Sequence, residues 1–220
     1  MIKLLDILLQ ENDEESILIP RRSPEERAKN YIIATNRKIQ QYIKDGGKGN
    51  LNLNDTPITS LPPNLKVGGY LYLNDTPITS LPSNLKVGGD LYLYNSKITS
   101  LPSDLKVGGS LYLSNTPIIS LPSNLKVGGY LDLNNTPIIS LPSNLTVGGY
   151  LYLYNSKITS LPSDLKVGGD LYLGNSKITS LPSDLTVGGN LYLYNTPLSK
   201  SHTKKQIKQM APGVKGNIYL

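Results

Sequence analysis

The chain has 220 residues, 22 basic against 16 acidic side chains, one histidine, and no cysteine, tryptophan or phenylalanine. Without cysteine there is no disulfide, thiolate zinc site or catalytic thiol, and a single histidine cannot build a Ser-His-Asp triad or a histidine metal cluster. No apolar run reaches the roughly eighteen residues of a membrane span. We therefore expect no enzymatic activity, no metal, no cofactor and no membrane partner.

Residues 1–48 predict a helical N-terminal cap. Residues 1–10 (M-I-K-L-L-D-I-L-L-Q) are interrupted by Asp6 and make a poor Sec signal peptide, although a short helix is expected at Leu4 to Leu9. These features leave the cytoplasm, a virion, or export by a non-Sec route as the expected locations.

A longer helix is predicted to begin at Ser23-Pro24-Glu25-Glu26, with Ser23 as N-cap, Pro24 at N1 and Glu26 closing a capping box. Gly46-Gly47 is expected to end it. We expect the helix to seal the first repeat with one face, formed by Ala28, Tyr31, Ile32, Thr35, Ile39, Tyr42 and Ile43.

Residues 49–198 repeat with a period of 20 residues, and the unit from Val67 reads V-G-G-Y-L-Y-L-N-D-T-P-I-T-S-L-P-S-N-L-K. A fixed period of this length indicates a solenoid. The alternation places Leu71 and Leu73 inward and Tyr70, Tyr72 and Asn74 outward on a half-buried strand. Successive repeats are expected to pair as parallel strands about 4.8 Å apart.

The second half of each repeat predicts an extended return path. Ile78, Leu81 and Leu85 supply further inward aliphatics, and a proline follows the equivalent of Leu81 in every unit. Proline at this period forbids a regular helix. Val67-Gly68-Gly69 is expected to form a flexible corner leading into the next strand.

Residues 199–220 contain five lysines and no acidic side chain. A basic helix is expected from Ser201 to Met210, with Thr203, Ile207 and Met210 inward. The last six residues (K-G-N-I-Y-L) repeat the pattern of residues 48–53 (K-G-N-L-N-L) and predict a ninth strand. The predicted fold is thus a right-handed parallel β-solenoid of little curvature, with nine strands on one face and a helix-free return side.

The basic excess lies outside the repeats, because residues 50–198 hold eight lysines, eight aspartates, and no arginine or glutamate. A nucleic-acid groove combines a basic stripe with interleaved aromatic side chains. Here the tyrosines occupy the neutral region and the C-terminal lysines lie elsewhere, which argues against a nucleic-acid partner.

The pattern L-x-L-x-x-(N/T/S)-x-I-x-x-L-P-x-x-L over residues 49–198 resembles the bacterial LPX subclass of leucine-rich repeats, known from secreted effectors with a helical N-terminal cap. The resemblance implies a leucine-rich-repeat solenoid that binds proteins. Members that are ubiquitin ligases use a catalytic cysteine, which this chain lacks. The sequence pattern S-L-P-x-N-L-x-V-G-G-x-L-x-L also resembles uncharacterised repeat proteins of tailed phages.

The repeats depart from the family pattern at the usual asparagine position, which holds threonine (Thr76) or serine (Ser96). We expect these inward hydroxyls to hydrogen-bond the turn backbone in its place.

Twelve of the fifteen tyrosines fall in three outward columns of the repeat. They either stack as ordinary strand residues or form a rigid amphipathic contact surface. The flanking columns vary between repeats while the return side hardly changes, which fits both ligand tuning and drift. The candidate binding residues are Tyr70, Tyr72, Tyr92, Tyr94, Tyr112, Tyr130, Asp132, Tyr150, Tyr152, Tyr154, Tyr172, Tyr192 and Tyr194.

The pairs Asp55/Asp75 and Asp164/Asp184 occupy equivalent positions of neighbouring repeats. They could share a cation or a proton, or they could be ordinary solvated turn residues, and the turn interpretation is favoured.

The leading functional hypothesis is a non-catalytic module that binds a protein or glycan on the tyrosine-rich strand face. The alternative is a structural protein that self-assembles. An open C-terminal edge strand could pair in a two-fold dimer, or matching ends could stack head to tail. Repulsion between the C-terminal lysines of two copies favours the head-to-tail mode.

Overall fold

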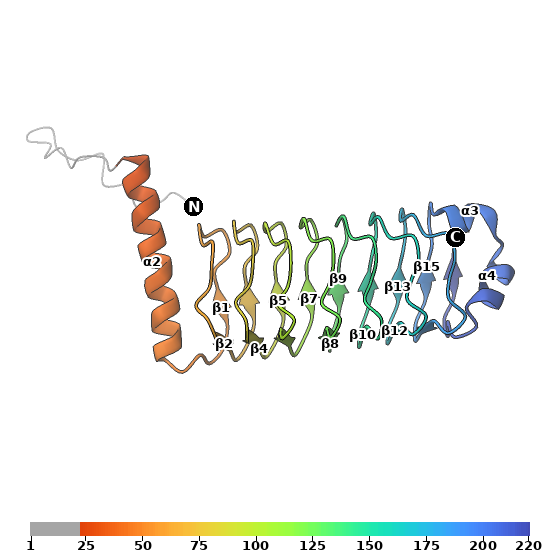
Figure 1. Cartoon of the computed structure of the whole chain (residues 1–220), viewed down its shortest axis with the longest axis horizontal. Coiled ribbons are helices and arrows are strands. Elements are labelled where there is room, and N and C mark those ends of the chain that lie inside the picture. Colours follow the sequence, from red (N-terminus) through yellow and green to blue (C-terminus); the bar gives the residue numbers. More distant parts are fainter. Residues whose placement is uncertain (1–22) are drawn as a thin grey trace, which may run out of the picture.

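The computed structural model describes residues 23–220, and the helix expected at Leu4 to Leu9 lies outside the described residues. The described chain is a row of stacked coils flanked by helices at both ends (Figure 1). Within residues 23–220, no helix combines the length and the hydrophobicity that a bilayer crossing needs.

Nine two-residue strands form one parallel sheet along the row of coils, as the sequence predicts. Each pairs with its neighbour one repeat away, so that Leu71 lies opposite Leu91 and Tyr72 opposite Tyr92. Figure 1 shows the coils in a nearly straight row. In sheet order the strands are β1 (Leu51–Asn52), β3 (Leu71–Tyr72), β5 (Leu91–Tyr92), β7 (Leu111–Tyr112), β9 (Leu131–Asp132), β11 (Leu151–Tyr152), β13 (Leu171–Tyr172), β15 (Leu191–Tyr192) and β16 (Ile218–Tyr219).

The return side is helix-free, as predicted, but it carries a second parallel sheet that the sequence analysis missed. Val67 is therefore a buried strand residue and not part of a flexible corner, because its carbonyl accepts from Gly88 N at 2.8 Å in the next coil. Only the two glycines form the bend. The strands are β2 (Lys66–Val67), β4 (Lys86–Val87), β6 (Lys106–Val107), β8 (Lys126–Val127), β10 (Thr146–Val147), β12 (Lys166–Val167) and β14 (Thr186–Val187).

The second glycine of each bend makes room for a side chain of the preceding coil. A Cβ added at Gly89 would lie 2.2 Å from the ring of Tyr70, and one at Gly109 would lie 2.1 Å from Asp90 Oδ1. Real Cβ atoms do not approach heavy atoms this closely. The outward side chains of the strand face therefore require glycine at this position of the next coil.

The inward threonines hydrogen-bond the turn backbone, as expected. Thr116 Oγ1 donates to Leu113 O at 2.6 Å, and the other inward threonines make the same bond. The serines do not: the hydroxyls of Ser96, Ser156 and Ser176 are buried and have no partner. Threonine's γ-methyl restricts χ1 and holds the hydroxyl toward the carbonyl, whereas serine lacks this constraint.

This difference predicts opposite effects of matched substitutions on stability. Thr116→Val should lower the free energy of unfolding by about 1 kcal/mol, because a buried hydrogen bond is lost. Ser156→Thr should raise the free energy of unfolding, and Ser156→Ala should leave it nearly unchanged. Urea unfolding followed by circular dichroism would measure all three. A loss in Ser156→Ala as large as that in Thr116→Val would contradict the interpretation.

The N-terminal helix α2 (Pro24–Lys44) has the predicted start. Ser23 Oγ accepts from Glu26 N at 3.1 Å, and Glu26 Oε2 accepts from Ser23 N at 2.9 Å.

The helix seals the first coil only in part, contrary to expectation. Thr35 and Ile39 are buried and Tyr42 packs on the core, but Ala28, Tyr31, Ile32 and Ile43 are exposed. The polar contacts of α2 fall instead on the edge of the coil. Lys38 Nζ donates to Asn52 O, and Tyr31 Oη donates to Asp55 O at 3.2 Å.

The C-terminal region forms two short helices, α3 (Pro197–Ser201) and α4 (Lys204–Met210), where one helix was predicted. His202 is extended and breaks the helix, and Thr203 caps α4 by accepting from Gln206 N. Thr203 is consequently exposed and not inward, while Ile207 is buried and Met210 packs on the core. The predicted ninth strand is confirmed as β16.

Candidate ligand-binding face

The outward side chains at the second position of each strand form a stacked column, the central ladder. Tyr72, Tyr92 and Tyr112 stack with ring centroids 4.7 and 4.6 Å apart. Asp132 takes the next position, in register with a tyrosine on either side. Beyond it the ladder continues through Tyr152, Tyr172, Tyr192 and Tyr219, with centroid separations of 4.7, 4.4 and 4.8 Å.

Tyr219 belongs to the central ladder although the sequence analysis did not select it. The available signal was the K-G-N-I-Y-L ending, which places Tyr219 in the column of Tyr72. Lys204 of α4 places Nζ 5.9 Å from the Tyr219 ring centroid and so covers this end of the ladder with a cation.

Tyrosines of the preceding column lean against the central ladder. Tyr70 meets Tyr72 and Tyr92 edge to face at 6.2 and 6.4 Å. Tyr130 stacks on Tyr150 at 4.8 Å, and Tyr150 packs edge to face on Tyr152. The structure thus brings these predicted residues together into one aromatic layer.

The third column is more exposed. Tyr94, Tyr154 and Tyr194 are 45%, 47% and 46% accessible, against half-buried rings in the central ladder. Tyr194 packs at a tilt on Tyr192. All thirteen predicted residues therefore lie on the strand face, and this column lies at its margin.

Polar residues of the flanking columns have structural roles. Asp90 and Asp170 each accept a backbone N–H of the next coil at 2.7 Å. Asn74 and Asn134 do the same for Tyr94 N and Tyr154 N. These polar side chains therefore support the backbone of the next coil.

Four phenols of the ladder have a raised pKa. Burial, first of all, raises the pKa of Tyr92, Tyr112, Tyr152 and Tyr172. For Tyr92, the hydrogen bond from Oη to Asp90 Oδ2 at 3.0 Å raises the pKa further, because the carboxylate disfavours a phenolate beside it. These four side chains consequently offer neutral hydroxyl groups.

The raised phenol pKa values predict an alkaline limit to stability. The unfolded pKa is about 10 and the folded pKa is higher, so this contribution is complete below pH 10 and is lost as pH rises above it. Asp90→Asn should lower the Tyr92 pKa, because it removes the carboxylate beside the phenol. The substitution should be tolerated, since Asn190 occupies the same column. Tyrosinate absorbance against pH would measure both effects. An unchanged titration in Asp90→Asn would contradict the assignment.

The aspartate pairs behave as turn residues. Asp55 and Asp75 adopt left-handed φ of 56°, which Asp tolerates in turns, and Asp75 accepts from Asn95 Nδ2 at 2.6 Å. Asp164 accepts from Asn144 N at 2.8 Å. Across residues 23–220, no cluster of three histidine, cysteine, aspartate or glutamate side chains could hold a metal ion.

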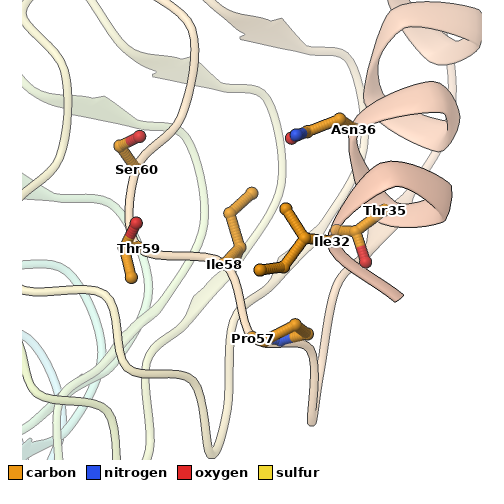
Figure 2. A pocket seen from close by; sticks show the side chains of 7 residues that line it. All are labelled: Ile32, Thr35, Asn36, Pro57, Ile58, Thr59 and Ser60. Carbon is orange, nitrogen blue, oxygen red and sulfur yellow. The ribbon is translucent and has the colours of Figure 1, made fainter. Parts of the chain in front are cut away.

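A small cavity lies where α2 meets the first coil. Figure 2 shows Ile32 opposite Ile58, with Asn36 and Pro57 beside them. Its volume of about 150 Å³ is below the several hundred cubic ångströms of typical ligand pockets. We interpret it as a packing gap left by the partial seal of α2.

Comparisons with known proteins bear on the fold. No family model and no curated protein matches the sequence. The leucine-rich-repeat domain of a Shigella effector superposes with a TM-score of 0.55 at 20% identity, covering 84% of this chain and 87% of that one. The fold is a leucine-rich-repeat solenoid. YopM from Yersinia enterocolitica gives a TM-score of only 0.36 at 17% identity, covering 83% of this chain and 54% of its own.

Proposed function

We propose that this chain is a non-catalytic recognition module that binds a protein or glycan through the tyrosine-rich strand face. The observation that carries the proposal is the central ladder, in which seven tyrosine rings follow one column and are held by stacking on their neighbours.

This face suits binding because its side chains are already ordered. Rings stacked at 4.4 to 4.8 Å lose little further freedom when a partner docks, which lowers the entropic cost of association. Tyrosine supplies apolar contact area and a hydroxyl in one side chain. The leucine-rich-repeat fold of the Shigella effector domain is consistent with such a role.

The proposal predicts that paired truncations abolish binding without unfolding the chain. Tyr92→Ala/Tyr112→Ala and Tyr152→Ala/Tyr172→Ala should each remove partner capture, because each pair opens a gap in the contact surface. Capture of proteins from a cell lysate would be measured with the immobilised chain, and binding to glycans would be measured on an array. Circular dichroism would verify the fold.

The matched control is Ile119→Ala/Ile139→Ala, which removes two exposed side chains, 60% and 61% accessible, from outside the tyrosine columns. It should capture the same partner as the wild type. Capture that survives both tyrosine pairs would show that the ladder is only structural.

The alternative is a structural protein that self-assembles. Head-to-tail stacking would use the outer edge of β1, where Lys38 and Tyr31 of α2 already bind the carbonyls of Asn52 and Asp55. Assembly would therefore have to displace α2, and this contact favours the recognition module.

We expect a monomer at all concentrations and salt conditions, because α2 binds the outer edge of β1 and α4 packs against β16 at the other end. Light scattering and negative-stain microscopy would test this, with Tyr31→Phe/Lys38→Met as the variant that frees the edge carbonyls of the first coil. Filaments or concentration-dependent growth of the wild type would favour the structural alternative.

A further inference from the structure

The central ladder contains one gap, at Asp132, and its geometry is that of a missing ring. Asp132 pairs in register with Tyr112 on one side and Tyr152 on the other. Tyr112 stacks on Tyr92, and Tyr152 stacks on Tyr172. Each ring adjoining the gap thus uses one face within its own stack and turns the other face toward the gap.

The width of the gap matches one planar group. Two strand spacings separate Tyr112 from Tyr152, or roughly 9.6 Å. Within the ladder, one ring fills the same span, since Tyr72 and Tyr112 lie on either side of Tyr92 at 4.7 and 4.6 Å. The side chain of Asp132 is shorter than a tyrosine and does not fill that span, which Tyr130 of the preceding column borders, since its phenol lies near both Tyr112 and Tyr152.

The Asp132 carboxylate makes the gap anionic, and residues 50–198 have no arginine or lysine in the outward columns of the strands. One carboxylate oxygen of Asp132 accepts from Asn134 N at 3.0 Å, and the other oxygen is available to a ligand. Residues 50–198 contain no arginine. Their eight lysines lie in the return-side column or beside the turn that follows the strand, at positions 66, 86, 97, 106, 126, 157, 166 and 177.

We propose that this gap is a subsite for one arginine side chain of a partner protein, with the guanidinium sandwiched between Tyr112 and Tyr152 and hydrogen-bonded to Asp132. The proposal rests on the proposed function and names the partner chemistry at its centre. Guanidinium is planar and cationic, stacks on aromatic faces and binds carboxylates through its N–H groups. Of the two side chains that are cationic throughout the neutral pH range, arginine alone is planar.

The far end of the same ladder supplies an internal parallel. There the final ring, Tyr219, has Lys204 Nζ placed 5.9 Å from its centroid. The gap at Asp132 lies between two such rings and adds a carboxylate, so a cation would find more interactions there than at the ladder end.

The test measures binding of a short peptide, Gly-Arg-Gly amide, to the full chain. Gly-Lys-Gly amide is the control peptide. Proton NMR titration should show saturable binding of the arginine peptide with upfield ring-current shifts of its side-chain protons, the signature of a group between two ring faces. The lysine peptide should bind at least tenfold more weakly. Equal binding of both peptides, or no saturable shift for the arginine peptide, would overturn the proposal.

Asp132→Asn isolates the charge, because Asn52 occupies the same column and makes the same backbone hydrogen bond to Asn54 N at 3.0 Å. It should weaken arginine binding at least tenfold. Asp75→Asn removes an equal charge from a turn position where other repeats carry asparagine, and it should bind like the wild type. Wild-type binding by Asp132→Asn would refute the role of the carboxylate.

Asp132→Tyr completes the ladder and should abolish arginine binding while raising the thermal midpoint. Partner capture separates the two proposals. If the tyrosine pair variants lose capture while both Asp132 variants retain it, the face binds its partner and the arginine subsite is wrong. If the peptide binds at Asp132 but the tyrosine pair variants retain capture, the wider binding face is wrong.

Discussion

The structure depends on the parallel pairing of successive coils in a register of 20 residues. Leu71 lies opposite Leu91 and Tyr72 opposite Tyr92, and the same relation holds along the strand face up to the last coil, where the spacing becomes 27 residues at Tyr192 and Tyr219. Equivalent side chains are therefore brought to one strand spacing, about 4.8 Å. Because this distance is also a comfortable stacking distance for aromatic rings, a column of tyrosines becomes a stack as soon as the coils pair.

The columns depend on one another through close approach of the backbone. Gly89 leaves room for the ring of Tyr70, and Gly109 leaves room for the carboxylate of Asp90. Where the preceding column holds a carboxylate, that side chain accepts the next backbone N–H. Where it holds tyrosine, the ring packs on the ladder instead. The strand face thus alternates between polar bonding and aromatic packing without changing the backbone.

This arrangement explains why a single exception in the ladder has chemical meaning. Stacked rings offer a partner their edges and hydroxyl groups, since their faces cover one another. At Asp132 two ring faces are turned toward one carboxylate. The proposed arginine subsite therefore lies at the one position where the regularity of the ladder fails.

The sequence alone determined the solenoid, the inward leucines, the capping box at Ser23 and the placement of thirteen candidate residues on one face, because a strict period repeats the same local environment in every coil. Tertiary structure decided what lies between or beyond the repeats. It recruited Val67 into a second sheet through a bond to the next coil, ended α3 at His202 and left most of α2 exposed. These outcomes follow from contacts between elements, which the periodicity of a single chain does not specify.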